Sequence, residues 1–220
     1  MTAAATKPKR RGWIGIPLGV VISSPSGGGK STVIRRLRQR HPEFLYSLSV
    51  TTRAPRSGER NGVHYHFVTK DEFDRMKRAD NLLEWAEVHG DFYGTPRTNV
   101  ERAMHEKRVL LFDIDVQGAA SIRRAERSFV TIFLLPPSMA ELKRRLAGRG
   151  SESPAQRKRR LETAKLELQR VHEYDYWVTN DQLSTCVTDC EAVIRAELLR
   201  RSRRHDSGLV DKRLTGSGTN

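Results

Sequence analysis

The sequence of 220 residues has little of what marks secreted or membrane proteins. It holds only two cysteines, Cys186 and Cys190, which lie four positions apart and form no CxxC pair. This usage argues against a disulfide framework or a zinc finger and indicates a reduced, cytoplasmic protein. No apolar run approaches the roughly 20 residues that a membrane span needs, so we expect no membrane partner.

A basic run followed by an apolar run near the start imitates a secretory signal. The apolar part contains Pro17 and two glycines, however, and leads straight into a glycine-rich turn. We therefore predict a disordered basic tail over residues 1–17 and a buried first strand over Leu18–Ile22. A second disordered tail is predicted over residues 202–220.

The net charge of +14 is concentrated in three short segments. Residues 1–11 hold four Lys/Arg and no acid, residues 200–220 hold six Lys/Arg and two Asp, and residues 143–160 hold eight Lys/Arg and one Glu. The rest of the chain is close to neutral, which argues against a specific nucleic-acid partner. The tails are expected to be solvated, whereas the internal basic segment requires a local anionic partner.

A glycine-rich turn separates an apolar run from a helical pattern in "LGVVISSPSGGGKSTVIRRL". Its end matches the phosphate loop G-x-x-x-x-G-K-[ST], although Ser24 stands at the first glycine, and the alternative is a chance glycine turn. Backbone N–H groups at such a helix start cradle phosphates, the lysine reaches the β- and γ-phosphates, and the hydroxyl binds Mg²⁺. We predict an ATP site at Ser26, Gly27, Gly28, Gly29, Lys30, Ser31 and Thr32.

Two acids follow a buried strand in "RVLLFDIDVQG". Ligands bind α/β sheets at the carboxyl ends of parallel strands, so Asp113 is predicted to act on Mg²⁺ through water, with Ser31 as a direct ligand. The alternative for Asp113 and Asp115 is a pair of helix-capping or turn aspartates. Further on, the patterns predict a buried strand in "FVTIFLLPP", a capping box of Ser138 and Glu141, a last strand at Trp177–Thr179 and a helix over residues 184–201.

Strands that alternate with helices imply an α/β fold with a doubly wound parallel sheet. Two stretches interrupt the alternation: residues 49–98 contain short strands and turns, including "HYHFV" and a Thr69–Glu72 capping box, and residues 148–157 contain glycine, serine and arginine. We predict an inserted lobe and a lid there, with core segments at residues 18–48, 99–147 and 158–201. Mobile lobes suit a phosphotransferase, because water must be excluded before a phosphoryl group moves.

Five blocks of the sequence occur in the order and spacing of guanylate kinases: "SPSGGGKST", "SVTTRAPRSGERNGVHYHF", "LLEWAEVHGDFYGTP", "LLFDIDVQGA" and "PPSMAELKRRLAGRG". The resemblance covers roughly Leu18 to Leu199. It implies a P-loop NTPase-type fold with an inserted GMP-binding lobe and a lid. It also implies ATP-dependent phosphorylation of GMP to GDP, with dGMP as a further substrate and with ATP and Mg²⁺ bound, in purine nucleotide metabolism.

The resemblance implies a GMP site as well. Arg53 and Arg56 match the arginines that grip the GMP phosphate, and forked guanidiniums suit a dianionic phosphate. The Glu84 carboxylate can accept both donors of the guanine pairing edge, which adenine lacks. The remaining positions implied for phosphate, ribose or guanine contacts are Ser49, Glu59, Tyr65, Tyr93, Thr95 and Asp115.

The internal basic segment matches the family's lid. Arg145, Arg149 and Arg160 correspond to the arginines that close over the ATP phosphates. With Lys30 they form the expected catalytic set, and no general base is expected, since phosphoryl transfer depends on positioning and charge stabilisation. Asn180 and Asp181 occupy the positions where the family touches adenine.

Three rival functions stay open at this point. A scaffold-type binding module would lack a working phosphate loop, and a kinase of ribose phosphates would not need Glu84 together with Ser49. A nucleic-acid binder would act through the tails. His64 and His66 could share a metal, although packing is favoured without a third ligand. Met76 and Trp177 are expected in the core, and a homo-oligomer is left open.

Overall fold

The computed structural model describes residues 18–88, 90–147 and 154–200. The predicted tails at residues 1–17 and 202–220, and residues 148–153 of the predicted lid, lie outside them. Among the described helices, none combines the length and the apolar character that crossing a membrane requires.

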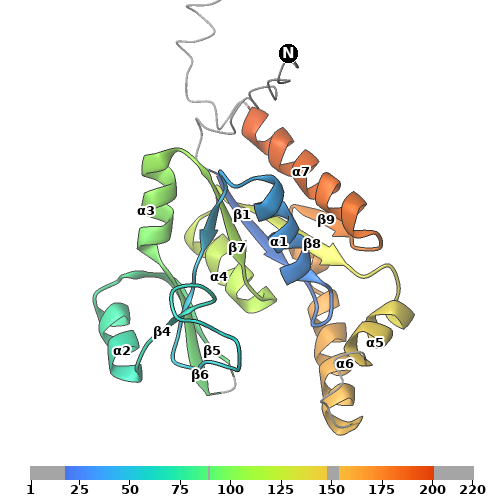
Figure 1. Ribbon diagram of the computed structural model, residues 1–220, viewed down its shortest axis with the longest axis horizontal. Helices are drawn as coiled ribbons and strands as arrows, with labels where there is room; N and C mark the ends of the chain where they lie inside the picture. The colour runs from blue at the N-terminus through green and yellow to red at the C-terminus, as the bar shows by residue number, and fades with distance from the viewer. Residues whose placement is uncertain (1–17, 89, 148–153, 201–220) are drawn as a thin grey trace, which may run out of the picture.

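A parallel sheet of five strands forms the centre of the molecule, in the order β2-β7-β1-β8-β9 (Figure 1). Val20 of β1 lies opposite Leu111 on one side and Val130 on the other. Strands of this kind are nearly continuous apolar runs because helices cover both faces. The predicted α/β fold with a doubly wound parallel sheet is confirmed. The strands are β1 (Leu18–Ser23), β2 (Leu45–Ser47), β7 (Val109–Asp113), β8 (Val130–Leu135) and β9 (Tyr176–Thr179).

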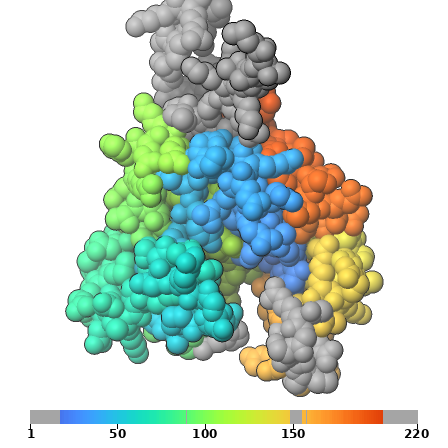
Figure 2. All heavy atoms as spheres, viewed as in Figure 1, coloured from blue at the N-terminus to red at the C-terminus, as the bar shows by residue number. Residues whose placement is uncertain are grey.

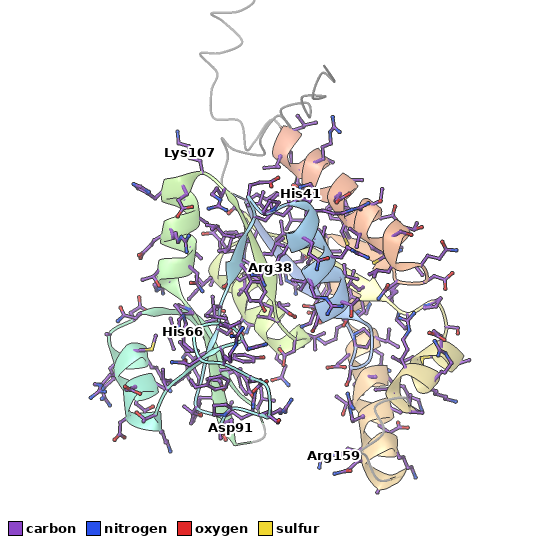
Figure 3. The ribbon with its side chains drawn as sticks, in the orientation of Figure 1. Arg38, His41, His66, Asp91, Lys107 and Arg159 are labelled. Atoms are coloured by element: carbon purple, nitrogen blue, oxygen red, sulfur yellow. The ribbon has the colours of Figure 1, made fainter. Side chains whose placement is uncertain are left out.

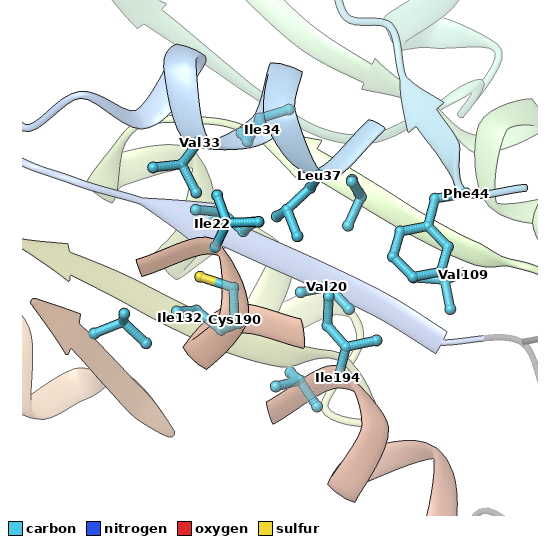
Figure 4. Close-up of a cluster of buried hydrophobic side chains, with 14 of the residues drawn as sticks. Val20, Ile22, Val33, Ile34, Leu37, Phe44, Val109, Ile132, Cys190 and Ile194 are labelled. Atoms are coloured by element: carbon cyan, nitrogen blue, oxygen red, sulfur yellow. The ribbon is translucent and has the colours of Figure 1, made fainter. Parts of the chain in front are cut away.

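Helices pack on both faces of this sheet. On one face, Leu37 and Ile194 belong to a cluster with Val20 and Ile22 of β1 (Figure 4). On the other face, Ile122 packs with the remaining strand side chains. Because these side chains are almost fully buried, truncating one to alanine costs about 2–5 kcal/mol. The first face carries α1 (Lys30–Arg40) and α7 (Leu183–Leu199), and the second carries α3 (Arg97–Glu106) and α4 (Val116–Ala125).

A second sheet, in the order β4-β3-β6-β5, projects from the core as a separate lobe (Figure 1). Phe73 is fully buried beneath it, and Thr69 and Glu72 form the predicted capping box of the lobe's helix. Trp85 is 41% exposed, and the Lys77 Nζ lies 3.5 Å from its ring centroid. The lobe comprises β3 (Val50–Thr51), β4 (His66–Phe67), α2 (Lys70–Arg78), β5 (Leu82–Val88) and β6 (Asp91–Pro96).

Two helices, α5 (Met139–Ala147) and α6 (Pro154–Leu168), form an arm on the side opposite the lobe (Figure 1), and the short helix η1 (Val171–Glu173) follows α6. The predicted capping box at the start of α5 is only half present. The Ser138 hydroxyl accepts the Glu141 N–H at 3.1 Å. The Glu141 carboxylate instead binds Arg144 and Arg145, which are three and four positions further along the helix.

The prediction that Trp177 lies in the core is wrong, because its side chain is 65% exposed. β9 is one of the two edge strands of the sheet, and its side chains alternate between the two faces. Val178 packs into the cluster under α7, so Trp177 faces the other way. Met76, in contrast, packs against the buried cluster of the lobe.

The surface is hollowed between the lobe and the arm of α5 and α6 (Figure 2). Asp91, at the tip of the lobe, and Arg159, near the far end of α6, flank this hollow from opposite sides (Figure 3). The segment that joins β1 to α1 lies at the head of the hollow (Figure 2). The predicted phosphate loop therefore faces the space between the two projections.

Candidate active site

The loop between β1 and α1 has the backbone of a phosphate cradle. Gly27 and Gly29 have φ values of +84° and +85°, which glycine adopts without the strain that a side chain would add. The Gly28 N–H donates to the Pro25 carbonyl at 2.8 Å and closes the turn. Lys30 then begins α1, so the N–H groups of the loop and of the first helical turn converge where an anion is best stabilised.

Ser24 replaces the first glycine of the motif without backbone strain. Among the described non-glycine residues, only Asp80 and Lys107 have positive φ, so Ser24 keeps an ordinary conformation. Its hydroxyl donates to the Pro25 carbonyl at 3.1 Å. A Cβ on Gly28 would lie 2.7 Å from the Ser24 Cβ, so the serine fits because position 28 is glycine.

Lys30 meets the acid that follows the buried strand. Its Nζ lies 3.1 Å from Asp113 Oδ1 and also donates to the Ile114 carbonyl. Ser31 and Thr32, which follow in α1, have exposed side chains. The residues predicted for the β- and γ-phosphates and for Mg²⁺ are thus neighbours at one end of the sheet.

Two of the three predicted lid arginines contact the surroundings of the phosphate loop. Arg145 donates to Glu141 Oε1 at 2.7 Å and to the Asn180 carbonyl at 2.9 Å. Arg160 donates through Nη2 to the Ser26 hydroxyl at 2.9 Å. Arg149 lies outside the described residues.

Asn180 packs against the phosphate loop and donates a hydrogen bond to its backbone. Its side chain is 6% exposed, and its Nδ2 donates to the Gly28 carbonyl at 2.7 Å. A Cβ on Gly29 would come within 2.4 Å of that nitrogen. Asn180 therefore braces the phosphate loop, a role that the sequence did not indicate. Asp181 is exposed. Contact of either residue with adenine stays a prediction.

Two residues of this region were missed by the sequence analysis. Glu167 of α6 accepts the Ser26 N–H through Oε2 at 2.8 Å, and burial raises the pKa of its carboxyl above its usual value. Tyr46 of β2 lies near Asp113, and burial together with that carboxylate raises the pKa of its hydroxyl. The spacing of Glu167 from Arg160 is seven residues, or two helical turns, which is the signal that could have linked them.

On the lobe, the predicted phosphate arginine is held by several partners. Arg53 donates to both oxygens of Glu59, at 3.0 and 2.9 Å, and to the Tyr93 hydroxyl at 3.2 Å. Glu59 also accepts the Arg56 backbone N–H at 2.8 Å, so it braces an arginine, while its contact with the nucleotide stays a prediction. Tyr65 stands edge-on to Tyr93, with ring centroids 6.1 Å apart. Four of these five side chains therefore form one connected group, and the Arg56 side chain is exposed beside it.

Two of the predicted base-reading residues, Glu84 and Thr95, are hydrogen-bonded to each other. The Thr95 hydroxyl donates to Glu84 Oε1 at 2.7 Å across the β5–β6 pair. Burial raises the pKa of Glu84 to about 7, the Thr95 hydrogen bond opposes this, and the nearby Asp115 carboxylate adds to it. Asp115 caps α4, because its Oδ1 accepts the Gly118 N–H at 2.8 Å, so the capping alternative holds for this residue. Ser49 lies between β2 and β3.

Tyr65 links the lobe electrostatically to the acid beside Lys30. Burial and the Asp113 carboxylate raise the pKa of its hydroxyl.

His64 and His66 are exposed, and the His64 ring accepts the Arg60 N–H at 3.1 Å. Within the part of the chain that the structure describes, no group of three or more His, Cys, Asp or Glu could hold a metal ion.

Known proteins resemble this chain over nearly all of its described length. The sequence model for guanylate kinase matches residues 18–197. Guanylate kinase of Agrobacterium fabrum is 49% identical over 87% of each chain, and that of Rhizobium meliloti is 48% identical over 92% of this chain and 91% of the relative. Guanylate kinase of Clostridium perfringens is 43% identical over 88% of this chain and 89% of the relative.

A solved structure agrees with the sequence relatives. The crystal structure of guanylate kinase from Anaplasma phagocytophilum superposes with a TM-score of 0.74 at 33% identity, covering 91% of this chain and 97% of that chain. The phosphate loop, the parallel sheet and the inserted lobe thus occur together in a chain whose relatives share one name. This chain belongs to the guanylate kinase family and is an enzyme of that family.

Proposed function

We propose that this enzyme transfers the γ-phosphoryl group of ATP to GMP and to dGMP, with Mg²⁺ bound and the lid closed. Relatives that match it over most of its length carry the name guanylate kinase. The observation that carries the proposal is the half-buried Glu84 carboxylate, which accepts the Thr95 hydroxyl at 2.7 Å. A carboxylate that accepts this one hydroxyl is suited to a ligand that brings two further donors.

Guanine supplies those donors. Its N1–H and 2-amino groups are adjacent, so Glu84 accepts both, while the Ser49 hydroxyl donates to O6 and Asp115 accepts the second amino hydrogen. Oδ1 of Asp115 accepts the Gly118 N–H that caps α4, so Oδ2 remains to accept a hydrogen bond from the base. Adenine offers Glu84 neither donor and would leave the carboxylate with the Thr95 hydroxyl alone. Sites built to hydrogen-bond a donor of the substrate reject an analogue without it by roughly 10⁴-fold.

The phosphates are held from two sides. Arg53 and Arg56, with the Tyr65 and Tyr93 hydroxyls, bind the GMP phosphate, and Glu59 keeps Arg53 in place. On the ATP side, the loop N–H groups bind the β-phosphate and position the γ-phosphoryl group for in-line transfer. The cations proposed to stabilise the charge of the transferring group are Lys30, Arg145, Arg149 and Arg160.

Ser31 and Asp113 are the residues that would hold Mg²⁺. Hydroxyl and carboxylate oxygens are the donors that this ion prefers, and both residues lie beside Lys30. When bound, the ion neutralises charge on the β- and γ-phosphates. Asn180 and Asp181 are proposed to border adenine. We infer a cytoplasmic enzyme that acts on small molecules, without a specific nucleic-acid or membrane partner.

A coupled assay tests the proposal. ATP is supplied with GMP, dGMP, AMP or ribose 1,5-bisphosphate, and nucleoside diphosphate formation is followed with and without Mg²⁺. We expect kcat/KM for GMP to exceed that for AMP by about 10⁴-fold, with dGMP close to GMP. Comparable turnover of AMP, or preferred turnover of the ribose phosphate, would contradict the proposed substrate.

A further inference from the structure

Helix α6 contacts a single residue of the phosphate loop at two points. Arg160 donates to the Ser26 hydroxyl at 2.9 Å, and Glu167 accepts the Ser26 backbone N–H at 2.8 Å. The two side chains lie two helical turns apart, on one face of α6. Ser26 is therefore held by the helix through both its side chain and its main chain.

The Glu167 carboxylate beside the phosphate loop is electrostatically unfavourable for ATP binding. Glu167 is partly buried, and a carboxylate repels the triphosphate that the loop is built to bind. Lys30 and Arg160 lie near enough to favour its charged form, while burial and Asp115 disfavour it. A negative charge next to a phosphate loop is expected only where its hydrogen bond has a function that outweighs the repulsion.

The position of Ser26 indicates that function. Its peptide N–H precedes Gly27, the first residue of the loop in the left-handed conformation. Fixing this N–H fixes the peptide plane that leads into the turn, and hence the direction of the N–H groups that follow. The same contact sets α6, and Arg160 upon it, against the loop.

We propose that Glu167 is a positioning residue for ATP: by accepting the Ser26 N–H it fixes the entry to the phosphate loop and aligns α6 so that Arg160 lies over the phosphates. This inference rests on the proposed function, since it concerns the ATP side of that site. The proposed role depends on the acceptor oxygen of the Glu167 side chain and not on its charge. Glutamine, which keeps an acceptor oxygen and loses the charge, should therefore replace glutamate, whereas alanine should not.

The test compares Glu167→Ala, Glu167→Gln and Glu167→Asp with the control Glu162→Ala. Glu162 lies on the same helix but is exposed and pairs with Lys165. Calorimetry gives the Kd of a non-hydrolysable ATP analogue and of GMP, steady-state kinetics give KM for each substrate, and a melting curve gives Tm. These measurements separate the binding of the two nucleotides from folding.

We expect Glu167→Ala to raise the Kd of the analogue and the KM of ATP by about 10-fold, as loss of one charge-assisted hydrogen bond predicts, with the Kd of GMP within about 2-fold. Glu167→Gln should return both ATP values to within about 3-fold of wild type. Glu162→Ala should match wild type. Wild-type ATP affinity in Glu167→Ala, or equal weakening of ATP and GMP that glutamine does not reverse, would overturn the inference.

If the alanine variant fails to fold, the Glu167→Asp variant tests the positioning role, because its carboxylate is one methylene too short to reach Ser26. Weakened ATP affinity with normal GMP affinity then supports the positioning role, and wild-type affinity for both overturns it. Failure of the proposed function is distinguishable: wild-type enzyme would not phosphorylate GMP, whereas the analogue Kd would still report on Glu167.

Discussion

The lobe and the phosphate-loop region hold their charged groups in different ways. On the lobe, Arg53 is fixed by a carboxylate, a tyrosine hydroxyl and a backbone carbonyl at once. Beside the phosphate loop, Lys30 pairs with Asp113 and Arg145 of α5 pairs with Glu141. On the proposed function, we expect the lobe to act as a fixed template, whereas Lys30 and Arg145 would exchange their carboxylate partners for phosphate.

This difference predicts which region determines the specificity for the base and which determines the rate of phosphoryl transfer. A fixed acceptor pattern discriminates between bases, because the wrong base does not supply the donors that the acceptors require. Exchangeable cations respond to charge that develops during transfer, and they act on turnover more than on affinity. Substitutions in the two regions should therefore separate into effects on GMP recognition and effects on kcat.

The largest effect is expected at Lys30. Lys30→Ala should lower kcat by about 10³-fold, since preorganised donors at a reacting group are worth that order, while the Kd of GMP changes by less than about 2-fold. Steady-state kinetics and calorimetry measure the two quantities. Lys165→Ala, which removes an exposed lysine of α6, is the control. A Lys30→Ala enzyme that turns over at full rate would refute the division between the regions.

The next effect should appear at Glu84. Glu84→Ala should lower kcat/KM for GMP by about 10²-fold and bring the GMP-to-AMP preference down by a similar factor, because two hydrogen bonds to a charged acceptor are lost. KM for ATP should not change. Thr95→Ser keeps the hydroxyl and should behave as wild type, and Glu87→Ala removes an exposed acid of the same strand. An unchanged base preference would mean that another group reads guanine.

A smaller effect is expected at Glu59. Glu59→Ala frees Arg53 from its bidentate partner, so the guanidinium must be ordered by GMP itself. We expect KM for GMP to rise by about 10-fold with kcat for saturating substrates nearly unchanged. Glu101→Ala, at an exposed acid of α3, serves as the matched control. A fall in kcat at unchanged KM would place Arg53 with the exchangeable cations instead.

The smallest effect is a dependence of GMP binding on pH. The pKa of Glu84 is raised to about 7, and only its ionised form accepts both guanine donors. GMP affinity should therefore weaken by a few-fold as the pH falls from 8 to 6, and binding near pH 6 should release a proton. Calorimetry in buffers of different ionisation enthalpy measures that release. Glu84→Gln should lose the part of the pH dependence and of the proton release that this carboxyl contributes. The part due to the second ionisation of the GMP phosphate, whose pKa is about 6, should remain in both proteins.

The same group links stability to pH. The pKa of Glu84 in the folded protein lies above its ordinary value of 4.5, so the folded state binds more protons between pH 4.5 and about 7. The free energy of unfolding should fall as the pH rises through this window and then level off. Denaturant titrations of wild type and Glu84→Gln measure the slope, which should be flatter in the variant.

Local patterns predicted the parts of the site that are close in sequence. The loop from Ser26 to Ser31 follows from glycine, lysine and hydroxyl spacing, and Asp113 follows from its place at the end of a buried strand. The Thr69–Glu72 capping box was predictable for the same reason. In each case the interactions that form the feature join residues close together in the chain, so the sequence alone predicts the feature.

Contacts between distant segments were not predictable in this way. Glu167 reaches Ser26 across 141 positions, and Asn180 reaches Gly28 across 152, so only the folded chain brings them together. The prediction for Trp177 failed because a large aromatic residue in a strand suggests a core position, whereas in β9 it is Val178, on the opposite face, that packs into the core.

Trp85 gives the lobe an optical reporter of its own. It follows Glu84 directly in β5, and the Lys77 ammonium lies 3.5 Å from its ring centroid. Indole emission responds to nearby charge and to solvent, so occupation of the base pocket should shift the fluorescence of Trp85. The sequence also contains Trp13 and Trp177, whose emission overlaps that of Trp85. Replacing both by phenylalanine would leave Trp85 as the reporter and allow the loading of one substrate to be followed by fluorescence.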